Sequence, residues 1–469
     1  MQSNRLLHYL ILYIPFLAAL AFSKNAHVSY LTAWFGSFFI FIVCYKEVIK
    51  KLPSDLPVAE QLLRPVYFMQ IIFAGYMSCT SIFYYLNTLG YDYITYVGNP
   101  NLLPLNIYES IANCQRMYVL GHAALVNGIL VAMSYPLKHN YKVYTNSMSN
   151  LLLGISFFCL PLGYLTGKVG GLNQFSIQLS SLSFVAGTIA LAFAIREHKR
   201  VNIWAAAILF SMNMFAALSS GFKEPVIITT LLLGVFLLPV YGRKIIPLFG
   251  AILIALFFVL PTFIGNFRQM VAEGTDVATA RNKSIDNIIN NDNLIEELQD
   301  DNWSFLVGRL SEIDMFIRYT NSTPYFMPYY KMELAENAIK MIIPRFFWPG
   351  KPDVEQLVMT RVYNAGVVDR ISLVSAKPAY IVDCYLSYGK IGIIIGLFLY
   401  GFIAQKISQI SEIWFGGYFM GTAVMFAGLF QILWRGNSFE FLISAIFWSF
   451  ITLIILQAVL KARGILVRI

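Results

Sequence analysis

The stretch PVIITTLLLGVFLLPVYGRKIIPLFGAILIALFFVLPTFIGNFRQM, residues 225–270, holds two long apolar runs separated by a short basic turn. The runs cover 225–241 and 245–264, and the turn carries Arg243 and Lys244. Runs of about 18 or more apolar residues are typical of helices that cross a bilayer, because lipid offers no partner to free backbone polar groups. After the second run the sequence turns polar and charged. The stretch therefore predicts two membrane-spanning helices that lead into one large loop.

The rest of the chain repeats this pattern. Its 469 residues are 58% hydrophobic and 13% charged, whereas soluble domains have about 25% charged residues. We expect an all-α polytopic membrane protein with about twelve spans, at 6–22, 29–44, 66–86, 117–134, 149–166, 175–195, 202–219, 225–241, 245–264, 391–405, 414–433 and 440–460. Nine spans fall in residues 1–264 and three in 378–469. Residues 265–377 form the large loop, in which we expect amphipathic helices.

The distribution of Lys and Arg predicts the orientation. With the N-terminus in the cytoplasm, the inner segments hold 16 of these residues and the short outer segments hold 5. Cytoplasmic loops carry an excess of Lys and Arg, and long loops cross the membrane regardless of charge. Both termini are therefore predicted inside and the large loop outside. Membrane topology accounts for the net charge of +9, so no nucleic-acid partner is expected.

Several kinds of site are missing from the sequence. The large loop has no histidine, and the chain has no HExxH, EF-hand or Ser-His-Asp pattern. The five cysteines are scattered, with no CxxC and no histidine at ligand spacing. We therefore expect no metal site and no cofactor.

Cations on the predicted outer side lie where the backbone is irregular. Arginine stays charged and binds phosphate oxygens in pairs, so several converging arginines would suit the diphosphate of a lipid. Arg318 and Arg361 are expected to be solvated or to contact headgroups, and Arg309 could instead pair with Glu312, three residues later. The remaining candidates for anion binding are Lys223, Arg268, Arg309, Arg345, Lys351 and Arg435.

A carboxylate could serve as general base beside these cations. The segment WSFLVGRLSEIDMFIRYT, residues 303–320, has Leu306, Leu310, Ile313 and Ile317 at helical spacing, which predicts one amphipathic helix. That helix would present Glu312 beside Arg309, so Glu312 is the first choice. Asp383 and Glu440 are the alternatives.

Three segments carry a family resemblance. VGRLSEIDMF (307–316), IPRFFWPGKPD (343–353) and YLSYGKIGIIIGLFLYG (385–401) resemble, in this order, bacterial oligosaccharide-repeat-unit polymerases of the Wzy type. The resemblance covers roughly Lys223 to Gly401. In SSGFKEP (219–225), Lys223 and Glu224 depart from the Ser-Gly-rich turn that the family has there, which weakens the assignment of that turn.

The resemblance implies a GT-C-like glycosyltransferase of the bacterial cytoplasmic membrane. Such an enzyme polymerises oligosaccharide repeat units carried on polyprenyl diphosphate, by metal-independent inverting transfer on the outer face, and makes polysaccharides such as O-antigen or exopolysaccharide. Its partners would be membrane lipid, a chain-length regulator and a flippase. By this analogy Glu312 would activate the acceptor hydroxyl, and Arg309 and Arg345 would be catalytic. Lys351, Arg268, Lys223 and Arg435 would bind the diphosphate.

Two other interpretations stay open. A glycan ligase would share the same chemistry and would differ only in its acceptor. A transporter or flippase of lipid-linked sugars would also have about twelve helices with both termini inside. It is opposed by the lack of a visible internal repeat and by the single large outer loop.

Overall fold

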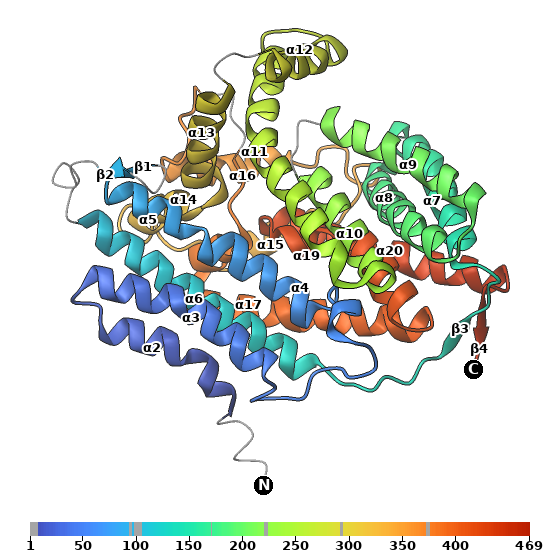
Figure 1. Ribbon diagram of the computed structural model, residues 1–469. Helices are drawn as coiled ribbons and strands as arrows, with labels where there is room; N and C mark the ends of the chain where they lie inside the picture. The colour runs from blue at the N-terminus through green and yellow to red at the C-terminus, as the bar shows by residue number, and fades with distance from the viewer. Residues whose placement is uncertain are drawn as a thin grey trace.

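The computed structural model describes residues 8–92, 96–97, 106–169, 171–219, 224–290, 294–371 and 376–469. These residues form a helical bundle with two small two-stranded sheets (Figure 1). Eight helical segments are long and apolar enough to cross a membrane, and one of them, Pro225–Ala272, contains two consecutive helices. Two shorter apolar helical segments, His8–Ala21 and Phe419–Leu429, accompany them. The chain is thus a helical membrane protein, and the total of twelve spans stays a prediction.

The first third of the bundle begins with a hairpin of helices. Asn25 caps the second of these helices by accepting a hydrogen bond from the Val28 amide at 3.1 Å. Pro65, at the first position of its helix, starts the next span. The elements are η1 (Ile11–Tyr13), α2 (Ile14–Ala21), α3 (Ala26–Tyr45), η2 (Val58–Glu60), α4 (Pro65–Ile72), the π-helix η3 (Phe73–Cys79), α5 (Ser81–Thr88), β1 (Tyr91–Asp92), β2 (Tyr96–Val97) and α6 (Asn106–Ala132).

The middle of the chain forms antiparallel helices that lead up to the large loop. In the tightly packed α7–α8 pair, the Ser156 hydroxyl donates to the Ser183 carbonyl at 2.7 Å. Such contacts between small polar residues are common between helices in membranes. The elements are β3 (Tyr141–Val143), α7 (Met148–Lys168), α8 (Asn173–Arg196), α9 (Arg200–Ser219), α10 (Glu224–Tyr241), η5 (Gly242–Lys244) and α11 (Ile245–Ala272).

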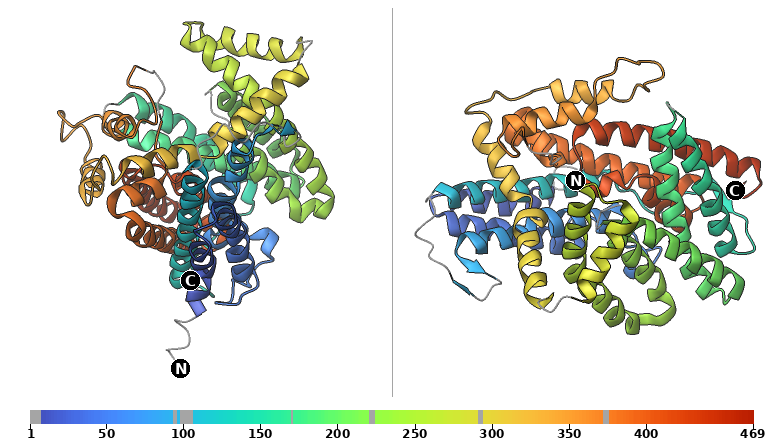
Figure 2. Two further views of the ribbon diagram at one scale, coloured as in Figure 1. Left: turned by 90° about the vertical axis from the view of Figure 1, so that its left-hand side faces the viewer. Right: turned by 90° about the horizontal axis from the view of Figure 1, so that it is seen from above.

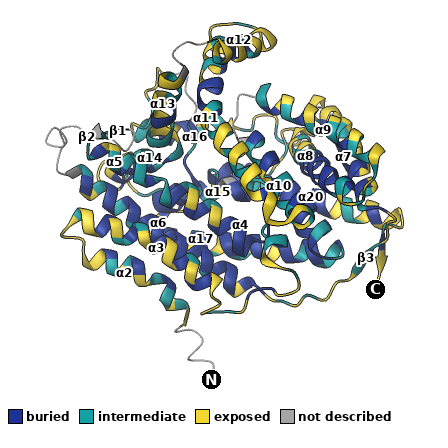
Figure 3. Cartoon of the chain, viewed as in Figure 1, coloured by how far each residue is buried: buried dark blue, intermediate teal, exposed yellow. Residues whose placement is uncertain are grey.

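The large loop is itself mostly helical. Helix α12 projects away from the bundle and is largely exposed, whereas α14 lies against α6 (Figures 1–3). The loop elements are α12 (Val277–Ile289), α13 (Leu294–Phe305), the π-helix η6 (Leu306–Leu310), α14 (Ile313–Ser322), α15 (Glu333–Lys340) and α16 (Val354–Asn364).

The last third completes the core. Strand β4 pairs with β3, which places the C-terminus beside the 141–143 segment. The elements are α17 (Tyr380–Trp414), the π-helix η7 (Phe419–Phe426), α18 (Ala427–Leu429), α19 (Ile432–Arg435), α20 (Phe439–Ala462) and β4 (Leu466–Arg468).

Helices α6 and α17 cross closely at the centre of the bundle, where both are mostly buried (Figure 3). A Cβ added at Gly128 would collide with the Phe398 carbonyl, and one added at Gly401 would collide with the Leu125 carbonyl. Small residues let helix backbones approach in this way. The glycines therefore set the spacing of this helix pair.

Two helices in this region differ from the sequence expectation. Helix α11 does not stop near Gly265 but continues to Ala272. Its 28 residues extend about 42 Å, longer than a bilayer core of about 30 Å, so its last turns can project beyond the lipid. The predicted single helix over 303–320 is broken, because Ser311 is extended between η6 and α14. Glu312 thus stands at the N-terminal cap of α14, not beside Arg309 on one helix.

The large loop also forms hydrogen bonds with α17 beside a kink in that helix. Tyr388 and Gly389 leave helical geometry, and Gly389 has a φ of 59°, which glycine adopts easily. The kink frees carbonyl groups one turn earlier. The amides of Tyr330 and Lys331 donate to the Leu386 and Ser387 carbonyls at 2.9 and 3.1 Å. The loop thus supplies the hydrogen bonds that the kinked helix loses.

Candidate functional site

Glu312 is held where two π-helices meet. The Tyr76 hydroxyl, from η3, donates to Glu312 Oε1 at 2.9 Å. Thr80, just beyond η3, donates to the Leu310 carbonyl, the last residue of η6, at 3.3 Å. π-Helices occur often at functional sites, because the extra residue disturbs the regular backbone ladder. Glu312 is half-buried, so its carboxylate is positioned by the membrane domain while it stays within reach of the loop surface.

Two of the predicted cations lie near each other in this part of the fold. Arg309 is exposed in the last turn of η6, three residues before Glu312. Arg268, near the end of α11, is close enough for the two positive charges to repel each other. Helix α13 packs along α11, where the Asn302 side-chain amide donates to the Phe258 carbonyl at 2.8 Å. Two like charges brought together in this way favour a bound anion.

Arg345 and Lys351 belong to a different part of the loop. The Lys351 ammonium donates to the Met341 and Ile343 carbonyls at 2.7 and 2.8 Å, and Arg345 donates to the Lys351 carbonyl at 3.2 Å. Burial lowers the pKa of Lys351, and the charge of Arg345 lowers it further. The main role of Lys351 here is to hold its own turn.

This turn is tied to α20 and lies near the α7–α8 end of the bundle. The Trp448 indole donates to the Ile342 carbonyl at 3.1 Å, and Phe346 lies beside Gly171. Helices α7 and α8 lie on the opposite side of the bundle from α13 and α14 (Figures 1 and 2). The candidate cations thus form two groups: Arg268 with Arg309, and Arg345 with Lys351. Lys223 and the side chain of Arg435 lie outside the described residues.

Arg361 contradicts the expectation that it is solvated. Its side chain is 3% exposed, and it joins Asp383 and Glu440, which are fully buried. The guanidinium contacts Asp383 at 3.0 and 2.9 Å and Glu440 at 2.8 Å twice. Burial alone would lower the pKa of Arg361, but the two carboxylates outweigh it and raise the pKa above its ordinary value.

Arg361, Asp383 and Glu440 together form the outer clamp. The two carboxylates proposed as alternative bases are therefore both paired with Arg361. Asp383 also accepts a hydrogen bond from the Phe439 amide at 2.9 Å. Both carboxylates are occupied by a buried cation, so they join α16 to α17 and α20. A base must reach an acceptor hydroxyl, and Glu312 is the more accessible of the three.

A second buried arginine forms an inner clamp at the other end of α17. Arg64 donates to Asp55 at 2.6 and 2.7 Å and to Glu412 at 2.9 and 2.7 Å. The Tyr135 ring lies 4.4 Å from the guanidinium carbon. The Thr422 hydroxyl donates to Glu412 at 2.8 Å. This clamp lies at the end of the bundle that the charge pattern assigns to the cytoplasm.

Tyr319 links the outer clamp to the Glu312 region. It is buried in α14, and burial followed by the Asp383 charge raises the pKa of its phenol, with a smaller effect from Glu312. Arg361 opposes this rise, so charges of the clamp and of Glu312 all act on the Tyr319 phenol.

Sequence reasoning missed Tyr76, Arg64 and Arg361. Tyr76 sits in an apolar run and gave no separate signal. Arg361 did have one: Val358, Arg361 and Val362 share the buried face of α16 at helical spacing.

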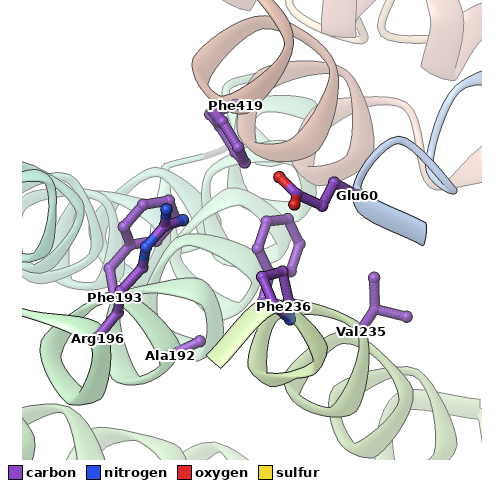
Figure 4. Close-up of a pocket in the computed structure, with 8 residues that line it drawn as sticks. Glu60, Ala192, Phe193, Arg196, Val235, Phe236 and Phe419 are labelled. Carbon is purple, nitrogen blue, oxygen red and sulfur yellow. The ribbon is translucent and has the colours of Figure 1, made fainter. Parts of the chain in front are cut away.

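Two pockets of the described residues lie away from Glu312. One is a small apolar pocket between η3, α6, α17 and α19, lined by Phe73, Leu125, Tyr400 and Trp434 among others. The other is lined by Glu60, Phe193 and Phe419 among others, at the end of the bundle that the charge pattern assigns to the cytoplasm (Figure 4). The candidate site is defined by its polar contacts, because a loop site at a membrane surface need not form a closed cavity.

Comparison with known proteins gives one family. The family model described as Domain of unknown function (DUF8712) matches residues 14–468. The chain belongs to this family. The DUF8712 match runs across the membrane helices and the large loop alike. No curated protein and no solved structure matches the chain.

Proposed function

We propose that this DUF8712 protein is a glycosyltransferase that polymerises oligosaccharide units carried on polyprenyl diphosphate at the outer face of a bacterial cytoplasmic membrane. One observation carries the proposal: Glu312 is held by Tyr76 of the membrane bundle, and Arg309, three residues before it, lies near Arg268 of α11. The resemblance of 307–316, 343–353 and 385–401 to Wzy-type polymerases supports the same chemistry.

In the proposed reaction, Glu312 removes the proton of an acceptor hydroxyl. The hydroxyl oxygen attacks the anomeric carbon of the donor glycan from the face opposite the diphosphate. The bond from that carbon to the diphosphate oxygen breaks, and polyprenyl diphosphate leaves with the electron pair. Arg268 and Arg309 would stabilise the negative charge that develops on it, since prearranged charges at the leaving group lower the barrier. Tyr76 is a positioning residue, because it acts through Glu312.

The test is a polymerisation assay on purified protein with a lipid-linked repeat unit. A positioned general base contributes about 10²–10⁴-fold and a preorganised charge about 10²–10³-fold to the rate. We expect Glu312→Gln and Arg309→Ala to lose long glycan chains to these extents while the protein still inserts. Arg318→Ala is the matched control, because Arg318 is an exposed arginine of α14 that pairs with Asp314. Normal chain length in both site variants would refute the proposal.

The products also separate a polymerase from a ligase of the same chemistry. A polymerase that loses its base leaves single lipid-linked units. A ligase that loses its base leaves long lipid-linked glycans that have not been transferred. Measuring the length of lipid-linked glycans in cells with and without the gene decides between them.

A flippase for lipid-linked sugars is a second candidate, and the apolar pocket between the two clamps favours it. The inner and outer clamps close opposite ends of α17, with an apolar pocket between η3, α6 and α17. Paired charges that open in turn could alternate access to a central site. Movement of a lipid-linked sugar across liposomes without formation of a glycosidic bond would support this candidate over the first.

A further inference from the structure

The inner end of the bundle carries a groove that the proposed function does not use. The inner groove is shallow and is lined by Glu60 of η2, Phe193 and Arg196 of α8, Phe236 and Pro239 of α10, and Phe419 of η7. It is open to its surroundings, at the end of the bundle that carries the basic turn Arg243–Lys244. Figure 4 shows Glu60 and Arg196 reaching the groove from opposite sides.

The two charges of the groove are not joined to each other. Among the described residues, no salt bridge includes Glu60 or Arg196, although the neighbouring Glu197 pairs with Lys199 at 3.6 Å. A carboxylate and a guanidinium that face one space without touching form a complementary pair for a ligand with both charges. A purely anionic ligand would satisfy Arg196 but would meet the charge of Glu60.

The walls of the groove are apolar and aromatic. The ring centroids of Phe193 and Phe419 are 5.7 Å apart, and those of Phe193 and Phe236 are 6.3 Å apart. Val235 and Pro239 extend this wall along α10. A ligand that fills the groove must therefore have an apolar part beside its charges.

We propose that the inner groove binds the head and upper acyl chains of a zwitterionic phospholipid of the inner leaflet. The phosphate would lie at Arg196, the ammonium at Glu60, and the chains along Phe193, Phe236 and Pro239. An ethanolamine head suits this arrangement because its ammonium can donate hydrogen bonds to a carboxylate. The groove is built from other elements than the Glu312 region, so this inference stands independently of the proposed function.

Occupancy of the groove would also support the inner clamp. Glu60 lies in the segment just before Arg64, and Phe419 lies one turn before Thr422, which donates to Glu412. A lipid that holds Glu60 and Phe419 in place would therefore stabilise the inner clamp from both sides.

The test uses delipidated, full-length protein in detergent and native mass spectrometry. The probes are short-chain phosphatidylethanolamine, short-chain phosphatidylglycerol and glycerophosphoethanolamine, which has the head without the chains. We expect phosphatidylethanolamine to bind most tightly, and each of Glu60→Gln and Arg196→Gln to weaken it about tenfold, the effect of losing one charge-assisted hydrogen bond. Arg243→Gln, an inner arginine that does not line the groove, should leave the affinity unchanged.

Three outcomes would overturn the inference. The first is equal affinity for phosphatidylethanolamine in the wild type and in both groove variants. The second is binding of phosphatidylglycerol as tight as that of phosphatidylethanolamine, which would show an anion site only. The third is equally tight binding of glycerophosphoethanolamine, which would show that the apolar wall is not used. The comparison of probes on the wild-type protein needs no variant to fold.

Discussion

Removing the charge of Arg361 provides the sharpest test of how the large loop is attached. Arg361→Met keeps much of the side-chain volume but leaves Asp383 and Glu440 buried without their cation. Breaking a buried ion pair on one side costs about 3–5 kcal/mol, because an uncompensated charge stays in a medium of low polarity. The free energy of unfolding should fall by this amount.

The expected change in melting temperature follows from the size of the chain. Unfolding entropy is about 2 cal/mol/K per residue, so 469 residues give about 1 kcal/mol/K. The melting temperature of Arg361→Met should therefore fall by about 3–5 °C, measured by intrinsic fluorescence during heating in detergent. Arg318→Met, which removes an exposed pair worth about 0.5 kcal/mol, should change it by less than about 1 °C.

A compensating variant separates the loss of charge balance from the loss of packing. Arg361→Met combined with Asp383→Asn and Glu440→Gln removes all three charges, and neutral replacements of buried ion pairs are often tolerated. This triple variant should recover most of the lost stability. If Arg361→Met melted within about 1 °C of the wild type, or the triple variant melted no higher than the single one, the outer clamp would not have the role assigned to it.

Three further predictions concern other parts of the chain. Tyr76→Phe should slow glycan polymerisation about tenfold and leave stability nearly unchanged, because it removes one hydrogen bond to Glu312; an unaltered rate would show that Tyr76 does not position the base. Gly128→Ala should lower the melting temperature by several degrees through its collision with the Phe398 carbonyl. Gly154→Ala, with open space around its Cβ, is the matched control, and equal melting of the two variants would contradict the close packing of α6 and α17. Burial alone would raise the pKa of Glu197, but hydrogen bonds from Ser147, Ser149 and two backbone amides lower it below 4.5. The stability that Glu197 contributes is therefore present above pH 4.5 and is lost as the pH falls through the folded pKa. The melting temperature of Glu197→Gln should depend less on pH across that range than that of the wild type.

The membrane bundle could be predicted from the sequence because lipid imposes one simple requirement. Every backbone polar group must be satisfied within the segment, so apolar runs become helices. The helix over 245–264 could be found in this way, but its continuation to Ala272 could not, since polar residues of a projecting turn resemble a loop. The start of α17 was missed for a related reason. Its first turns, from Tyr380 to Gly389, contain Asp383 and a kink that Tyr330 and Lys331 stabilise from a distant part of the chain.

The candidate site could be predicted only where the contacts are local. Arg309 and Glu312 are three residues apart, so their proximity follows from any compact backbone. Their relation to Arg268 and Tyr76 depends on how α11, α13 and η3 pack, which no spacing in the sequence reveals. The failure at Arg361 has a different cause. The charge of Arg361 suggested that its side chain is exposed to solvent. The apolar neighbours Val358 and Val362, however, indicate that this face of α16 is buried.

The two clamps bear on the choice between a polymerase and a flippase. Asp383 and Glu412 lie near the two ends of α17, and Asp383 comes before the break in the helix at Tyr388 and Gly389. The turns before this break fold back along the helix, where the Tyr380 hydroxyl donates to the Gly396 carbonyl at 3.4 Å. A flippase would have to break at least one clamp in each cycle, at a cost of several kcal/mol unless the substrate replaced the lost partner. A polymerase with its chemistry at Glu312 needs both clamps closed, because they hold α17 and the loop segments packed on it in one position. On this argument Arg361→Met should reduce polymerisation through misplacement of the loop, whereas in a flippase the same change should favour the open state and accelerate transport.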